Sequence, residues 1–137
     1  MPATYAAVSR VLAELALRLP DFAPESLLDA GAGPGTASWA ACHHFPDLVA
    51  ITQADTHGGF LELAGRLNEA APSPALRGAN VRAADLAAPP VAADLVVAAY
   101  CLAECAIERA ASIAAALWRA ASGGLAIIEP GTPHGFA

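Results

Sequence analysis

Residues 26–36, SLLDAGAGPGT, constrain the fold of this chain more than any other stretch of the sequence. A short apolar strand containing Leu27 and Leu28 ends in the carboxylate of Asp29. Glycines follow at every second position, at Gly31, Gly33 and Gly35, and a helix is expected to begin at about Thr36. Glycines let a ligand approach the backbone, and the first helical N–H groups are free donors. A strand that enters a helix through such a turn is typical of a small-molecule site.

The spacing of the glycines separates two classes of cofactor. The dinucleotide fingerprint G-x-G-x-x-G would require a glycine at residue 36, where Thr36 stands. The pattern D-x-G-x-G-x-G resembles motif I of the class I S-adenosylmethionine-dependent methyltransferases, and the resemblance implies cofactor contacts from Asp29, Ala30, Gly31, Gly33 and Gly35. A carboxylate repels a pyrophosphate and attracts the amino group and sulfonium of S-adenosylmethionine. A turn without a ligand and a nicotinamide-dependent oxidoreductase are the alternatives.

The rest of the chain alternates between strand and helix patterns. Strands are predicted at residues 27–29, 48–54, 80–83, 94–100 and 125–129, and helices at 2–19, 36–44, 58–70 and 107–121. Residues 71–78 are predicted as a loop, Trp118 is placed on the inner face of its helix, and Gly123 and Gly124 are expected to cap that helix. This alternation predicts a single α/β domain over residues 1–137 with a Rossmann-like class I methyltransferase fold. Its parallel sheet of about five strands is expected in the order 3-2-1-4-5, with helices on both faces.

Acidic side chains follow several of the predicted strands. Asp55 lies 22 positions after Gly33, near the spacing of a ribose-binding carboxylate, and opens a stretch with Thr56 that resembles the second methyltransferase motif. A helix N-cap is the alternative role for Asp55. Asp85 and Leu86 resemble the adenine contact of that family, although a solvated loop aspartate is nearly as well supported.

The side chains available for catalysis are few. Tyr100 closes the fourth predicted strand and is expected to border the methyl-transfer pocket, or to act as a lid or core residue. Cys101 occupies the place of a nucleophile in cytosine-5 methyltransferases, but Cys101 and Cys105 fit small packing residues better. Glu104 and Glu129 are expected to orient a substrate or to pair with an arginine such as Arg109. No catalytic residue is assigned, and the histidines show no metal-ligand spacing.

Composition limits the partners that the sequence can suggest. The net charge is −6, all seven cations are arginines, and no basic stripe for phosphate contacts is visible. No apolar run reaches the ~18 residues of a membrane span. An odd number of cysteines without framework spacing, and an N-terminus without a signal-peptide pattern, indicate reduced thiols in a cytoplasm.

Four stretches together resemble the mitochondrial small-ribosomal-subunit methyltransferase-like family and its bacterial relatives: MPATYAAVSRVLAEL, LLDAGAGPGTASWAA, DLVVAAYCLAE and LAIIEPGTPHGF. The resemblance implies a class I methyltransferase fold and a role around small-subunit ribosomal RNA or ribosome assembly, as an enzyme or as a non-catalytic RNA-binding factor. Family members continue into further strands and a cysteine-rich region that this sequence lacks. The fifth strand is therefore expected to leave an exposed edge, in a fragment or in a homodimer that covers it.

Overall fold

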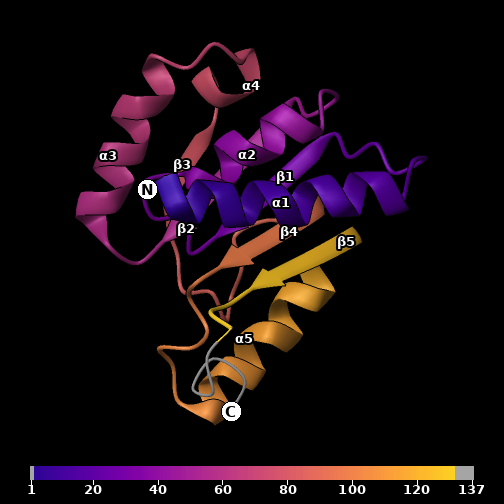
Figure 1. The fold of residues 1–137 in the computed structure, drawn as a ribbon. Coiled ribbons are helices and arrows are strands. Elements are labelled where there is room, and N and C mark those ends of the chain that lie inside the picture. Colours follow the sequence, from indigo (N-terminus) through magenta and orange to yellow (C-terminus); the bar gives the residue numbers. More distant parts are fainter. Residues whose placement is uncertain (1, 132–137) are drawn as a thin grey trace.

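A computed structural model describes residues 2–131 and shows one five-stranded parallel sheet in the order β3-β2-β1-β4-β5 (Figure 1). The strands are β1 (Ser26–Ala30), β2 (Ala50–Asp55), β3 (Asn80–Ala83), β4 (Ala93–Ala99) and β5 (Ala121–Ile128). The expected α/β class and strand order are confirmed. β1 lies in the middle, so the glycine turn that follows it opens at the point where the strand order reverses.

Helices cover both faces of the sheet, as expected. They are α1 (Pro2–Arg18), α2 (Thr36–His44), α3 (Gly58–Glu69), α4 (Pro74–Arg77) and α5 (Ile107–Ala120). One core cluster joins α1, α2 and α4 to the sheet, and a second joins α5 to the opposite face. The short helix α4 lies within the predicted loop at 71–78, where Ser73 accepts the backbone N–H of Leu76 and Pro74 begins the helix.

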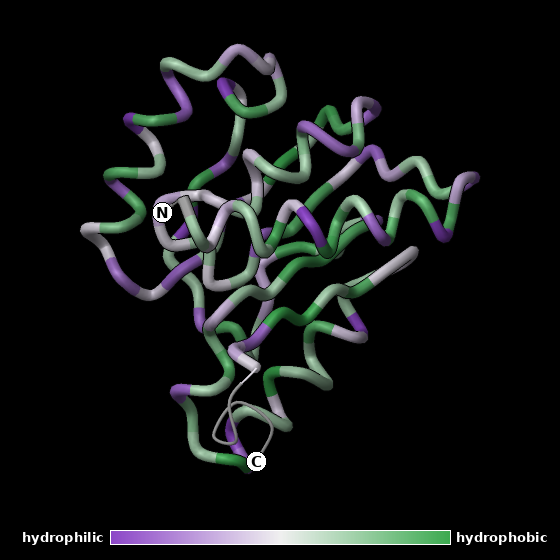
Figure 2. Tube along the Cα trace, viewed as in Figure 1, coloured by the Kyte–Doolittle hydropathy of each residue, from purple (hydrophilic) through white to green (hydrophobic). Residues whose placement is uncertain are grey.

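The continuous apolar pattern of β4 reflects burial on both faces. Leu95 and Val97 belong to the core under α1 and α2, whereas Val96 and Ala98 face α5. All four residues are fully buried. Figure 2 shows the central part of the sheet, where β1 and β4 lie, as mostly hydrophobic, in contrast to the alternating hydrophilic and hydrophobic residues along α3. A strand between two helical layers has no polar face, which explains the run DLVVAA.

The end of α5 differs from the sequence prediction. Gly123 and Gly124 lie within β5 and do not cap the helix, because β5 begins directly after Ala120. A Cβ on Gly123 would lie 2.6 Å from the Phe22 ring and 2.8 Å from the carbonyl oxygen of Asp94, so close packing excludes a side chain there. Trp118 is 70% exposed, and its predicted place on the inner face is wrong.

The outer edge of β5 pairs with no other strand in the described part of the chain. Ile127, on the same side of β5 as Leu125, is 42% exposed beside this edge. None of the helices in residues 2–131 has the length and apolar character needed to cross a bilayer.

Candidate functional site

A cavity of about 660 Å³ lies beyond the carboxyl ends of the strands, where the glycine turn, α1 and α5 meet. A cavity of this size falls in the range of small-molecule and cofactor sites. Of the residues expected at the site, the cavity is lined by Asp29, Gly31, Gly33, Asp55, Thr56, Leu86 and Tyr100. Ala30, Gly35 and Asp85 do not line it.

Asp29 is held inside the protein at the end of β1. It is 1% exposed, and its Oδ2 accepts hydrogen bonds from the backbone N–H of Ser38 (3.0 Å) and the Ser38 hydroxyl (2.6 Å). Burial raises the pKa of Asp29 to about 6, although the bonds from Ser38 oppose the shift. Asp29 therefore fixes the start of α2 against β1 and also adds a carboxylate to the cavity wall.

The glycine turn depends on three left-handed backbones. Gly31, Gly33 and Gly35 have φ angles of 70°, 54° and 94°. The N–H groups of Gly31 and Ala32 donate to the Ala54 carbonyl (2.8 and 3.0 Å), which ties the turn to β2. Around Gly33 a Cβ would meet nothing within 4 Å, so the turn is open toward the cavity there.

Asp55 links the glycine turn to the start of α3. Its Oδ2 accepts the N–H of Gly33 at 2.8 Å, and its Oδ1 accepts the N–H of His57 at 2.9 Å. The N-cap of α3 is His57, whose Nδ1 accepts the N–H of Phe60, so the N-cap alternative for Asp55 is wrong. A carboxylate also has further lone pairs, so Asp55 remains able to accept hydrogen bonds from a ligand.

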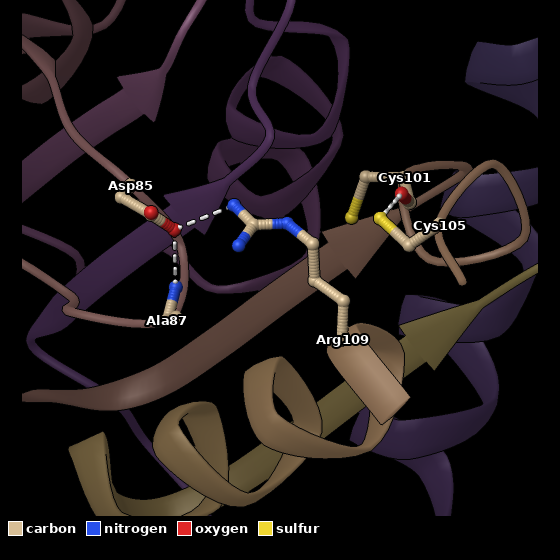
Figure 3. A network of polar contacts seen from close by, with 5 residues as sticks. All are labelled: Asp85, Ala87, Cys101, Cys105 and Arg109. Carbon is tan, nitrogen blue, oxygen red and sulfur yellow. Dashed lines mark hydrogen bonds and ion pairs between the residues drawn. The ribbon is translucent and has the colours of Figure 1, made fainter. Parts of the chain in front are cut away.

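Asp85, in the loop after β3, is paired with Arg109 from the start of α5 (Figure 3). Its Oδ1 accepts the N–H of Ala87 at 2.9 Å and Nη2 of Arg109 at 3.0 Å. The backbone bond from Ala87 and the Arg109 guanidinium hold the pKa of Asp85 below its usual value. Arg109, expected as a partner of Glu104 or Glu129, instead pairs with Asp85 and lines the cavity.

Tyr100 and the two cysteines form the part of the cavity wall that follows β4, beside the glycine turn. Tyr100 has a left-handed backbone (φ 58°), and its N–H donates to the Ile128 carbonyl at 2.7 Å. The Cys101 thiol points to the Ala30 carbonyl (3.8 Å), and the Cys105 thiol to the Cys101 carbonyl (3.5 Å; Figure 3). Burial, with the nearby Glu129 carboxylate, raises the pKa of Cys101 to about 12, so its thiol is protonated at neutral pH. This state suits packing and opposes a nucleophilic role.

The charges around the cavity favour a cationic ligand. Of the described residues that line it, Asp29, Asp55 and Glu104 carry carboxylates and Arg109 carries a guanidinium. A pyrophosphate needs free N–H donors at such a turn, but the N–H of Gly33 is already bonded to Asp55. Within residues 2–131, no three histidine, cysteine, aspartate or glutamate side chains are grouped to hold a metal ion.

A sequence model of the family described as mitochondrial small ribosomal subunit Rsm22 matches residues 1–137. The chain belongs to this family. The human ribosome assembly protein METTL17, mitochondrial, is 32% identical over 138 residues, which cover 97% of this chain and 30% of METTL17. The chain thus spans less than a third of the length of this curated relative.

Solved methyltransferase structures share the fold of this Rsm22 family member. Magnesium protoporphyrin IX methyltransferase from Synechocystis, with bound S-adenosylhomocysteine, superposes with a TM-score of 0.74 at 17% identity and covers 94% of this chain and 57% of its own. The glycopeptide N-methyltransferase MtfA, complexed with sinefungin, gives 0.70 at 15% identity and covers 88% and 53%. The class I methyltransferase fold is therefore confirmed.

Several lining residues of this Rsm22 domain were not predicted as site residues. Thr4 and Val8 come from α1, which precedes the glycine turn and has no residue pattern that marks a ligand contact. His57 and Phe60 stack with ring centroids 4.5 Å apart at the start of α3. A helix that follows the fourth strand begins at the ligand edge of the sheet, and this topology is the one sequence signal that could have indicated Arg109.

Proposed function

We propose that the cavity binds S-adenosylmethionine and that the chain is a methyltransferase domain. The observation that carries the proposal is the acidic wall at the carboxyl ends of β1 and β2, where Asp29 and Asp55 flank a glycine turn that is open at Gly33. This wall fits a ligand with an ammonium and a sulfonium, and it disfavours the dinucleotide alternative.

In this proposal, each end of the cofactor meets a different part of the cavity. The Asp55 carboxylate, beside Thr56, accepts hydrogen bonds from the ribose hydroxyls. The adenine lies toward Leu86, and Asp85 reaches it once the exposed Arg109 side chain moves aside, since both partners are about half exposed. The Gly31 and Gly33 backbones and the Asp29 carboxylate face the amino-acid part.

The methyl group would leave the sulfonium by in-line attack of an acceptor, a reaction for which alignment supplies much of the catalysis. The cavity wall formed by Tyr100 from the end of β4 and Thr4 from α1 borders the space for that acceptor. The residues of this wall hold the reactants in line and limit access of water. The cofactor supplies the activated methyl group.

For the acceptor, we propose small-subunit ribosomal RNA, or a protein bound to it. The support is membership in the Rsm22 family and the similarity to the human protein METTL17, a ribosome assembly protein. With a net charge of −6, this segment supplies little general attraction for RNA, so contacts with the ribosome would depend on specific surfaces.

A non-catalytic ribosome-assembly factor that keeps the fold is the second candidate. The protonated Cys101 thiol favours it, as does the engagement of the His57 imidazole in capping α3. Neither group is then free to activate an acceptor at the cavity.

Calorimetric titration tests cofactor binding, with S-adenosylmethionine, S-adenosylhomocysteine and NAD as parallel ligands. Binding of the first two in the micromolar range without binding of NAD is expected. A folded chain that gives no heat at millimolar S-adenosylmethionine would contradict the proposal. Transfer of labelled methyl groups to small-subunit RNA then separates the candidates, because an assembly factor would co-purify with the subunit without methylating it.

Two further expectations stay predictions. A homodimer would form through the edge of β5 that pairs with no other strand in residues 2–131, and sedimentation equilibrium tests this by measuring the mass of the particle in solution.

A cytoplasmic location is expected from the free cysteines, whereas the human relative is named as a mitochondrial protein. Fractionation of the source cells decides the compartment.

A further inference from the structure

The carboxylate of Glu129 is surrounded by backbone donors from a distant loop. Its Oε1 accepts the N–H groups of Cys101 (3.2 Å) and Leu102 (2.8 Å), and its Oε2 accepts that of Ala103 (3.3 Å). Successive N–H groups that converge in this way form an anion-binding nest. The anion here belongs to the protein itself, 26 to 28 residues further along the chain.

The end of β5 therefore fixes the loop after β4 at four consecutive positions. Tyr100 donates to the carbonyl of Ile128, and the next three N–H groups donate to Glu129. The left-handed backbone of Tyr100 is unfavourable for a non-glycine residue and persists only where its surroundings determine it. The two neighbouring residues Ile128 and Glu129 supply that constraint.

This loop is a wall of the cavity. Tyr100, Cys101, Glu104 and Cys105 all line it. Glu129 itself does not line the cavity, so any effect of its side chain on a ligand passes through the loop. Its negative charge also fills the nest, which leaves no converging donors there for a phosphate or carboxylate ligand.

We propose that Glu129 is a positioning residue for the cofactor site: its carboxylate holds the loop at residues 100–103 in the conformation that binds S-adenosylmethionine. The inference rests on the proposed function. It also gives a physical role to Glu129 of the stretch LAIIEPGTPHGF, which carries the family resemblance without explaining this residue.

The first test compares Glu129→Gln with Glu62→Gln, a matched change at an exposed glutamate on α3. Glutamine keeps the shape but removes the charge and turns an NH₂ group toward the donors. We expect about tenfold weaker binding of S-adenosylhomocysteine by Glu129→Gln, in line with the loss of charge-assisted hydrogen bonds, and unchanged binding by Glu62→Gln. Equal affinities of the two variants would overturn the proposal.

The second test uses Glu129→Ala with added formate. Formate can occupy the emptied nest, so its addition at tens of millimolar is expected to restore most of the lost affinity, with no effect on Glu62→Gln. Loss of affinity together with global stability, and no recovery with formate, would assign Glu129 to folding alone and overturn the positioning role.

Hydrogen exchange provides a readout without any ligand. The amides of residues 101–103 are expected to exchange at least about tenfold faster in Glu129→Gln, while core amides of β4 stay protected. Unchanged exchange at 101–103 would contradict the proposal even if the wild type binds ligand. Failure of the wild type to bind S-adenosylhomocysteine, with faster exchange in the variant, would reject the proposed function and retain the role of Glu129 in the loop.

Discussion

The side chain of Cys101 occupies the space that a Cβ on Gly31 would need: the two carbon atoms would lie 2.8 Å apart. Gly31 also has a φ of 70°, which disfavours any L-residue. The first glycine of the turn is thus required by the fold as well as by a ligand, because the loop after β4 packs directly against it. The glycine turn and the loop after β4, which both line the cavity, meet at this contact.

Gly31→Ala is therefore expected to destabilise the protein by about 2–4 kcal/mol, from the strained backbone and the overlap with Cys101. Gly65→Ala is the matched control: it lies within α3, a Cβ there meets nothing within 4 Å, and it is expected to stabilise by about 0.5–1 kcal/mol. Urea denaturation of both variants measures the difference. A Gly31→Ala variant as stable as wild type would show that the loop after β4 yields easily.

Asp29 makes the stability depend on pH in an unusual direction for a carboxyl group. Its pKa is raised from 3.8 to about 6 in the folded state, so the folded state binds the proton more tightly than the unfolded state. The resulting stabilisation is fully present below pH about 4 and is lost as pH rises through about 6. The shift corresponds to about 3 kcal/mol.

The substitution Asp29→Asn removes this ionisable group, so the stability of the variant relative to wild type should rise by up to about 3 kcal/mol between pH 4 and pH 7.5. Urea denaturation of both proteins across this range gives the difference directly, and acid effects common to both cancel. A constant difference would mean that the Asp29 carboxylate is already ionised at pH 4, with hydrogen bonds from Ser38 that outweigh its burial.

The fold followed from the sequence because its signals are local. Apolar runs, the glycine turn and the acids at strand ends place nearly every element, and the helix at Thr36–His44 and the strand at Asn80–Ala83 agree with the structure residue for residue. The predicted place of Trp118 on the inner face of α5 was wrong because helix periodicity does not show which of two apolar faces meets the sheet. The predicted capping role of Gly123 was wrong because a glycine is needed there to make room for the Phe22 ring, which lies far away in the sequence.

The candidate site was only partly predictable for the same reason. Motif positions located Asp29, Asp55 and Tyr100, but the contacts that define their roles come from distant segments. The pairing of Asp85 with Arg109 requires the start of α5 to lie beside the loop after β3, and the nest around Glu129 requires β5 to end beside the loop after β4. No spacing in the sequence encodes these approaches.

Cys101 should react slowly with alkylating reagents. With a pKa of about 12, its thiolate fraction at pH 8 is on the order of 10³-fold below that of an ordinary cysteine. Iodoacetamide labelling of a Cys42→Ala/Cys105→Ala variant, followed by mass spectrometry, isolates this thiol. If Cys101 is labelled at the rate of a free cysteine near neutral pH, and if this labelling abolishes methyl transfer, the nucleophile interpretation would be restored.

The buried side chain of Gln53 packs against the glycine turn at Gly35 and pairs with the side chain of Asn68. Gln53 and Asn68 are 0% and 3% exposed and exchange two amide hydrogen bonds (2.7 and 3.4 Å), and the Gln53 amide lies 2.7 Å from where a Cβ on Gly35 would be. Asn68→Ala leaves the Gln53 amide buried without this partner and is expected to cost about 1–3 kcal/mol. Adding Gln53→Leu should recover part of that loss, because both polar groups are then absent. A double-mutant cycle by urea denaturation tests this, and additive losses would show that the pair is not coupled.

Asp55 is the residue whose change should separate ligand binding from folding most clearly. Each of its oxygens accepts one backbone N–H, from Gly33 on the glycine turn and from His57 at the start of α3. Asp55→Asn turns an NH₂ group toward one of these donors and removes the charge that attracts a cation. We expect at least about tenfold weaker binding of S-adenosylmethionine, with a stability loss of about 1–2 kcal/mol. Asp47→Asn, at an exposed turn after α2, is the control and should change neither quantity. If Asp55→Asn loses stability but binds the cofactor as well as wild type, the carboxylate serves the turn alone, and the ribose must be held by other residues of the cavity.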